Sequence, residues 1–259
     1  MHKECGTSRG SKPVHIGDLC MGLISHLHHI ITRTLAGCIK LLGHPASQKH
    51  ALTEQDLSSV VQSLPSSPSH DDFLFVAILF TGWYCLLQLG ELVQPNNCCL
   101  WDFWKAICHS SMKFASSPQP HIAFFLPMHK ADQLWEGSSI VLEQWTGPLD
   151  PLPVFKNYLS SHDKLFPHLP DLWLTEASKI PTCSWFITRL HTFFPAKNVA
   201  GHSLCTSGAM ALALASTPLD CIQLIGHWSS EAFLIYLCQN PILLQGSLSG
   251  HSAFDHTHA

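Results

Sequence analysis

The sequence predicts an α+β fold that is mainly helical and contains one small three-stranded antiparallel sheet. Helical spacing of apolar residues dominates the chain before residue 99 and again after Asp150. Between these two parts, aromatic and β-branched runs alternate with Ser, Pro and Gly turns, which is typical of strands joined by hairpins. Helices that flank a separate group of strands define the α+β class.

Two helices are expected near the N-terminus. Apolar residues recur at helical spacing over 17–42, after which Gly and Pro break the pattern. Thr53 and Asp56 have the spacing of a capping box, in which each side chain bonds the other residue's backbone N–H. The sequence therefore predicts a second helix over 54–64.

Residues 73–90 form an apolar run that is long enough to be mistaken for a membrane span. The run contains Gly82 and Gln88, and Glu91 follows it. These residues favour a helix that is apolar on all sides because it is buried inside a domain. No association with a membrane is expected.

The centre of the chain predicts the sheet, and the remainder predicts helices. Three runs rich in aromatic and β-branched residues, 99–107, 121–128 and 138–145, are expected to be its strands. A short apolar run over 172–175 interrupts the helical part. The helices expected after Asp150 cover 151–162, 183–194, 203–216, 218–226 and 229–238.

The charge composition does not favour a strong nucleic-acid binder. The net charge is -4, and only 12% of the residues are charged, whereas neutralising phosphates requires a basic surface. Arginine is especially rare: three residues, against 19 His, 11 Cys and 8 Trp. Because C-to-T changes at CG dinucleotides convert arginine codons into Cys, Trp, His or Gln codons, we hypothesise that the chain is a mutationally decayed copy of an arginine-richer ancestor.

Neither the cysteines nor the histidines predict a metal site. The 11 cysteines contain no CxxC pair, which fits neither a disulfide framework nor a zinc ribbon and favours a reducing intracellular setting. The N-terminus carries no recognisable secretory signal. The histidine-rich segment 26–29 and the histidines of the tail lack a complete four-ligand spacing. We expect no metal and no cofactor.

Three segments carry a resemblance to a known family. They read TGWYCLLQLGEL at 81–92, LPMHKADQ at 126–133, and GHSLCTSGAMALALASTPLDCIQLIGHWSSEAFLIYL at 201–237. In this order they resemble the catalytic domain of the tyrosine recombinase (phage integrase) family, particularly recombinases of fungal mobile elements. The resemblance covers roughly residues 40–241, and its last segment is the most specific.

The resemblance implies a metal-free transesterification that breaks and rejoins DNA. In the family, a tyrosine attacks a DNA phosphate and forms a 3′-phosphotyrosyl bond while the 5′ hydroxyl leaves. Two arginines, two histidine-type donors and a lysine surround the phosphate, because the transition state concentrates negative charge. The implied function is DNA integration and recombination.

Each role is carried over by position in the motifs. Tyr236 matches the nucleophile, nine residues after His227, which matches a donor to a phosphate oxygen. His202 matches the first histidine. Lys130 matches the lysine that protonates the leaving oxygen, and Glu91 matches the acid that supports the first arginine.

Two departures from the family pattern predict an impaired enzyme. The first arginine position holds Gln88 and the second holds Cys205. Arginine supplies a permanent charge and a bidentate fork, which neither an amide nor a thiol replaces. One arginine at a phosphoryl transition state contributes roughly 10³ to 10⁵ in rate. We expect weak DNA association and no strand cleavage.

Two other functions stay open from the sequence. A non-catalytic DNA-binding or scaffold protein could keep the fold. Alternatively, residues 201–205 nearly spell the nucleophile elbow of an α/β-hydrolase, with Ser203 as the nucleophile. The segment before Ser203 is broken by Pro195 and does not resemble the buried strand that such an elbow must follow.

The expected organisation follows from the resemblance. Residues 1–50 are interpreted as a remnant of the helical region that clamps DNA, 51–242 as the catalytic-type domain, and 243–259 as a flexible tail. The expected partner is double-stranded DNA, bound weakly, with homo-oligomers forming on the DNA. The expected location is intracellular, and nuclear in a eukaryote.

Overall fold

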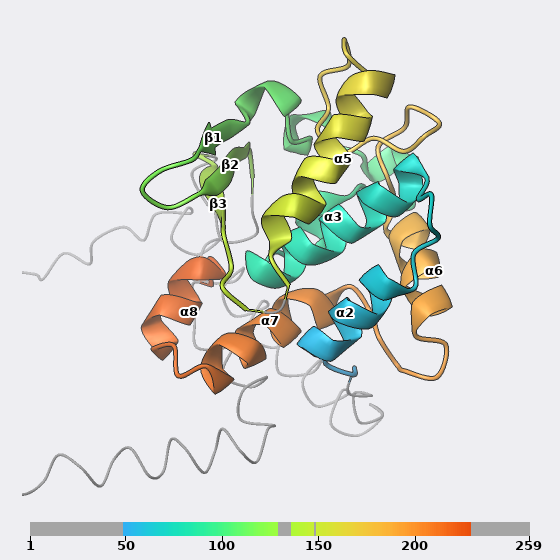
Figure 1. Cartoon of the computed structure of the whole chain (residues 1–259). Helices are drawn as coiled ribbons and strands as arrows, with labels where there is room; N and C mark the ends of the chain where they lie inside the picture. The colour runs from blue at the N-terminus through green and yellow to red at the C-terminus, as the bar shows by residue number, and fades with distance from the viewer. Residues whose placement is uncertain (1–48, 129–135, 148, 229–259) are drawn as a thin grey trace, which may run out of the picture. The chain divides into compact units, whose positions relative to one another are not determined.

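The computed structural model describes residues 49–128, 136–147 and 149–228 (Figure 1). The chain divides into two units, Met1–Ser47 and Gln48–Ala259, and all described residues belong to the second. The helices expected over 17–42 and 229–238, and the tail, lie outside the described residues. Within them, the mainly helical α+β class with one three-stranded antiparallel sheet is confirmed.

The first described helix, α2 (Glu54–Gln62), begins where the sequence predicts. Its N-cap is Thr53, whose side chain accepts from the backbone N–H of Asp56 while the Asp56 carboxylate accepts from the N–H of Thr53. Both bonds satisfy backbone donors that a helix start leaves open.

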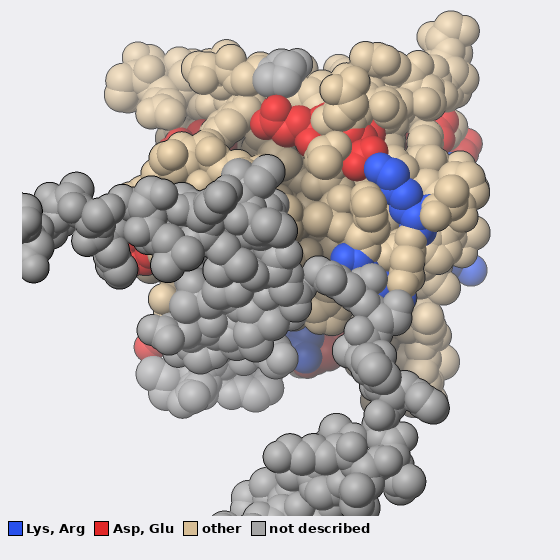
Figure 2. Space-filling view, turned by 90° about the horizontal axis from the view of Figure 1, so that it is seen from below, with Lys and Arg blue, Asp and Glu red and all other residues tan. Residues whose placement is uncertain are grey.

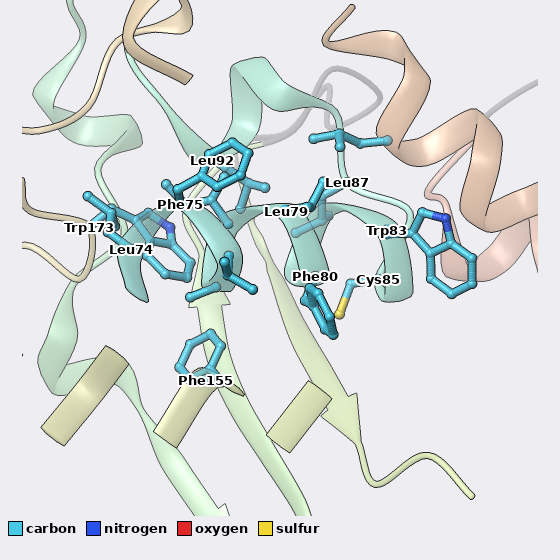
Figure 3. Packing of buried hydrophobic residues seen from close by; sticks show 14 of the residues in the cluster. Leu74, Phe75, Leu79, Phe80, Trp83, Cys85, Leu87, Leu92, Phe155 and Trp173 are labelled. Atoms are coloured by element: carbon cyan, nitrogen blue, oxygen red, sulfur yellow. The ribbon is translucent and has the colours of Figure 1, made fainter. Parts of the chain in front are cut away.

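Helix α3 (His70–Tyr84) is the central element, as Figure 1 shows. Eleven of its fifteen residues are buried, because α5, α6 and α7 all pack against it. In Figure 3 its side chains point in several directions into one apolar cluster that also includes Phe155 and Trp173. The prediction of a helix buried on all sides is confirmed. Among the described helices, none is both long and apolar enough to cross a bilayer.

The sheet has the strand order β1-β2-β3 and is antiparallel throughout. Its strands are β1 (Lys113–Ala115), β2 (His121–Leu126) and β3 (Ser138–Glu143). In the register, Ala123 lies opposite Lys113 on one side and Val141 on the other. The second and third predicted strands are confirmed.

The expected strand over 99–107 is wrong. This segment forms two short 3-10 turns, Cys98–Leu100 and Phe103–Lys105. The side chains of Asn97 and Asp102 each accept from the backbone N–H two residues later, which favours a local turn over a strand ladder. Two of the three aromatic residues in this run are exposed: Phe103 keeps 67% and Trp104 keeps 85% of its surface.

Four further helices follow the prediction, with bounds that differ by up to three residues: α5 (Pro151–Leu165), α6 (Cys183–Phe193), α7 (His202–Leu214) and α8 (Leu219–Ile225). The short helix α4 (Leu89–Leu92) and a third 3-10 turn, η3 (His109–Ser111), were not predicted. The apolar run 172–175 is a buried extended segment. It packs beside α5, where the hydroxyl of Tyr158 donates to the carbonyl of Leu172.

Candidate active site

A sharp turn between α3 and α4 positions Gln88 and Glu91. The turn includes Leu86, a buried leucine with a φ of 54°. Gln88 is the N-cap residue of α4, and its backbone N–H donates to Oε2 of Glu91 at 2.7 Å. This bond fixes the Glu91 carboxylate over the start of α4, and the Gln88 side chain is half-buried.

The first turn of α7 carries the second group of predicted residues. His202 is the first residue of α7 and is exposed, whereas Cys205 is buried one turn later. The thiol of Cys205 donates to the backbone carbonyl of His202 at 3.6 Å. The imidazole therefore faces solvent while the thiol faces the interior.

Two glycines let α7 approach α3 and α4 closely. A Cβ placed on Gly201 would lie 3.0 Å from the Cβ of Leu89, and one on Gly208 would lie only 1.9 Å from the carbonyl oxygen of Trp83. The N-terminal part of α7 thus packs directly against the end of α3 and the start of α4. This packing places the segment that carries positions 88 and 91 against the segment that carries positions 202 and 205.

The environment of Cys205 keeps its thiol neutral. Burial raises its pKa to about 11, and the negative charge of Glu91 adds to the shift. Cys205 is neither a cation nor a reactive thiolate near neutral pH.

His227 follows the C-terminus of α8 and has a φ of 52°. It lines a cavity of about 470 Å³ together with Gly208 and Ala211 of α7 and residues of β3. The adjacent Trp228 packs on the small apolar cluster that contains Cys205. His227 therefore lies beside Gly208 and Ala211 of α7.

The described residues thus place Gln88 and Glu91 in α4 and its N-cap, which packs against the start of α7, where His202 and Cys205 lie. His227 lies beside Gly208 and Ala211, further along α7. Lys130 and Tyr236 lie outside the described residues, so the predicted sheet lysine and nucleophile are not placed. The cavity beside His227 was not predicted. Its walls come from residues such as Tyr84, Trp145 and Leu224, whose sequence separation gives no spacing signal.

Ser203 does not have the setting of a hydrolase nucleophile. It is buried in the first turn of α7, and its Oγ accepts from the backbone N–H of Ala200 at 3.1 Å. The preceding described segment, 194–201, contains no strand. The elbow geometry, which needs a strand leading into the helix with the serine exposed, is absent from this part of the described chain.

The fold has clear counterparts among solved structures. The chain is similar to the XerH site-specific recombinase bound to palindromic difH substrate, with a TM-score of 0.52 and 12% identity, over 80% of this chain and 55% of that one. Similarity to XerA recombinase has a TM-score of 0.52 and 16% identity, over 82% and 67%. For the Tn1549 transposon integrase in complex with circular intermediate DNA, the values are 0.50 and 13%, over 82% and 70%.

The chain has the tyrosine recombinase fold. No family model and no curated protein matches the sequence. The assignment of the fold therefore rests on the similarity to solved structures alone. The chain spans little more than half the length of the XerH chain. The resemblance to recombinases of fungal mobile elements stays a prediction.

Proposed function

We propose that this recombinase-like chain associates weakly with double-stranded DNA and does not cleave it. The observation that carries the proposal is the neutral pair at positions 88 and 205, where the motif resemblance expects two arginines. Gln88 carries an uncharged amide. Cys205 is buried, and its raised pKa keeps it protonated.

The electrostatics of these positions oppose a phosphate transition state. A pentacoordinate phosphorane requires fixed positive charge around its oxygens. The negative charge of Glu91 contributes to the raised pKa of Cys205. In the family pattern this acidic residue supports an arginine. Without the arginines, positions 88 and 205 supply no positive charge to the anionic transition state.

The charge distribution supports weak association with DNA. Seen from below in Figure 2, the surface outside the grey atoms is mostly uncharged, with a few basic side chains beside a group of acidic ones. No continuous basic surface appears on this face outside the grey atoms. Since phosphate neutralisation supplies most non-specific affinity, binding that persists only at low salt is expected.

Exposed cysteine and tryptophan side chains support the hypothesis of mutational decay. Cysteine is usually buried, whereas arginine is usually exposed. In the described chain, Cys98, Cys99, Cys108 and Cys221 are exposed, and Trp104 keeps 85% of its surface. These environments suit arginine better. An absence of TG and CA dinucleotides at their codons in the nucleotide sequence would end this hypothesis.

A covalent trapping experiment tests the loss of cleavage. Nicked suicide DNA substrates trap a phosphotyrosyl intermediate as a protein–DNA adduct that resists denaturation. We expect no adduct with the unmodified chain and an adduct with the double variant Gln88→Arg, Cys205→Arg. Adding Tyr236→Phe to that variant should abolish the adduct.

The controls separate chemistry from folding. Circular dichroism must show that the double variant keeps the helical content of the parent. An adduct with the unmodified chain would overturn the proposal. A folded double variant without an adduct would refute the assignment of positions 88 and 205 to the two arginines.

The second candidate function is a non-catalytic DNA-binding or scaffold protein with this fold, made of a clamp remnant (1–50), a catalytic-type domain (51–242) and a tail (243–259). It is supported by the same loss of charge within an intact packed core. Salt-dependent gel shifts without covalent product would favour it, as would homo-oligomers on DNA and nuclear localisation in a eukaryotic cell. Labelling of Ser203 by a fluorophosphonate would instead favour a hydrolase.

A further inference from the structure

Three metal-ligating side chains converge where η3 meets the C-terminal end of α5. They are His109, His162 and Asp163, whose ligand atoms all lie within 4.8 Å of one another. Nε2 of His109 is 2.9 Å from Oδ1 of Asp163, and Nδ1 of His162 is 3.4 Å from the same oxygen. Figure 1 shows this end of α5 at the top of the view, whereas α7 lies at the bottom.

The hydrogen bonding of His162 defines which of its nitrogens can bind a ligand. Its side chain is 1% exposed, and Nε2 lies 3.0 Å from the backbone carbonyl oxygen of Asp171. A carbonyl oxygen only accepts, so Nε2 carries the proton. Nδ1 then presents a lone pair toward the carboxylate of Asp163.

In this arrangement two hydrogen-bond acceptors, Nδ1 of His162 and the carboxylate of Asp163, face each other. A lone pair on Nδ1 and a carboxylate oxygen 3.4 Å away repel unless a proton or a cation lies between them. A metal ion satisfies both acceptors. A ligating histidine that donates its other N–H to a backbone carbonyl is the usual outer-sphere arrangement of metal sites.

We propose that His109, His162 and Asp163 bind one divalent transition metal ion of the zinc type. Two imidazole nitrogens and one carboxylate oxygen are ligands that Zn²⁺ prefers, and water completes a tetrahedron. The three residues lie in two segments far apart in the sequence, so no motif spacing announces the site. The proposal does not depend on DNA binding or on recombinase chemistry.

Binding requires one movement, which the structure permits. The two imidazole rings are stacked, with centroids 4.8 Å apart and planes inclined by 4°. Because a metal lies in the plane of each ligating ring, the His109 ring must turn out of the stack. Its side chain is 33% exposed and can rotate, whereas His162 is held by Asp171.

The ion would reinforce a junction that is already hydrogen-bonded. The backbone N–H of His109 donates to the carbonyl of Pro170, and that of Leu172 donates to the carbonyl of Ile107. These bonds join the segment before η3 to the loop that follows α5. A metal shared by His109 and His162 adds a side-chain tie at the same place, so its role is structural.

Zinc binding to the full chain, treated with chelator and dialysed, tests the proposal. The chain has 19 histidines, so the difference between variants is diagnostic rather than the total count. His109→Ala and Asp163→Asn should each bind one zinc ion fewer by calorimetric titration. At zinc concentrations 100-fold above Kd, the parent should gain about 5–10 °C in Tm, and both variants should gain much less.

His168→Ala is the matched control, because His168 is an exposed histidine in the loop after α5 and should keep both the stoichiometry and the Tm gain. Co²⁺ in place of Zn²⁺ should give tetrahedral absorption bands in the parent and the control only. Equal zinc stoichiometry and equal Tm gains in His109→Ala, Asp163→Asn and the parent would overturn the proposal. His109→Ala changes a partly exposed side chain, so its metal-free Tm should stay close to that of the parent.

Discussion

Replacing Gly208 by alanine should disrupt the contact between α7 and α3. The new Cβ would lie 1.9 Å from the carbonyl oxygen of Trp83 and 2.7 Å from a methyl group of Leu86. Real Cβ atoms essentially never come closer than 3.0 Å, so the two helix backbones must separate by more than 1 Å at this point. The carbonyl belongs to a buried helix and cannot rotate away.

The free energy of unfolding should fall by at least about 3 kcal/mol. This is the upper end of the range for substitutions that overpack a core, because backbone rather than a flexible side chain must move. For a domain of this size, that loss lowers the Tm by about 6–12 °C. Urea denaturation followed by circular dichroism measures it. Gly90→Ala is the control, because a Cβ there meets nothing within 4 Å, and its stability should change by less than about 1 kcal/mol. If Gly208→Ala were as stable as Gly90→Ala, the close packing of α7 on α3 would be refuted.

Two further predictions concern buried groups. Tyr158→Phe should lower the free energy of unfolding by about 2–4 kcal/mol, measured by urea denaturation, because the Tyr158 hydroxyl donates to the carbonyl of Leu172 and accepts from the N–H of Leu174. Tyr84→Phe loses one hydrogen bond at a half-buried site and should lower it less. Equal losses in the two variants would contradict the two-bond role of Tyr158. Burial raises the pKa of Cys205 to about 11 and that of Cys85 to about 12, so above pH 9 the folded chain retains two protons that the unfolded chain releases. The free energy of unfolding should therefore fall by about 1.4 kcal/mol per pH unit for each buried thiol. Urea titrations under reducing conditions should show this slope flattened in a double alanine variant of the two thiols, and an unchanged slope would refute the prediction.

Local sequence signals located helix starts better than helix ends. The capping box at Thr53 marks the start of α2 correctly. Helix α3 begins three residues before the predicted apolar run, because Ser69 and Asp72 form a second capping box. It ends at Tyr84, although the apolar run continues to Leu87, since the chain turns sharply there. Hydrophobicity reports burial and does not distinguish a helix from the buried turn that follows it.

The prediction of a strand over 99–107 is wrong because aromatic composition alone does not indicate a strand. The side chains of Phe103 and Trp104 are exposed and contribute little to a core. Short-range caps at Asn97 and Asp102 decide the local structure instead. On the proposal of mutational decay, Trp104 replaces an arginine, so its aromatic character carries no information about the ancestral fold.

Motif order indicated which positions belong to the candidate active site but not how they are held. The sequence does not show that Glu91 accepts from the backbone of Gln88, or that two glycines let α7 approach α3 and α4. It also does not bring His109 next to His162, because their proximity depends on how the loop after α5 returns to η3. Such contacts arise from tertiary packing, which spacing along the chain does not encode.

The central place of α3 has a consequence for biosynthesis. Its last residue is 84, whereas α7, which covers part of its surface, is complete only at residue 214, which is 130 residues later (214 − 84). At ribosomal speeds of about 5–20 residues per second, this delay lasts roughly 6–26 s. During that interval α3, an apolar segment of fifteen residues, lacks the cover that α7 provides. The nascent chain should therefore bind ribosome-associated chaperones strongly.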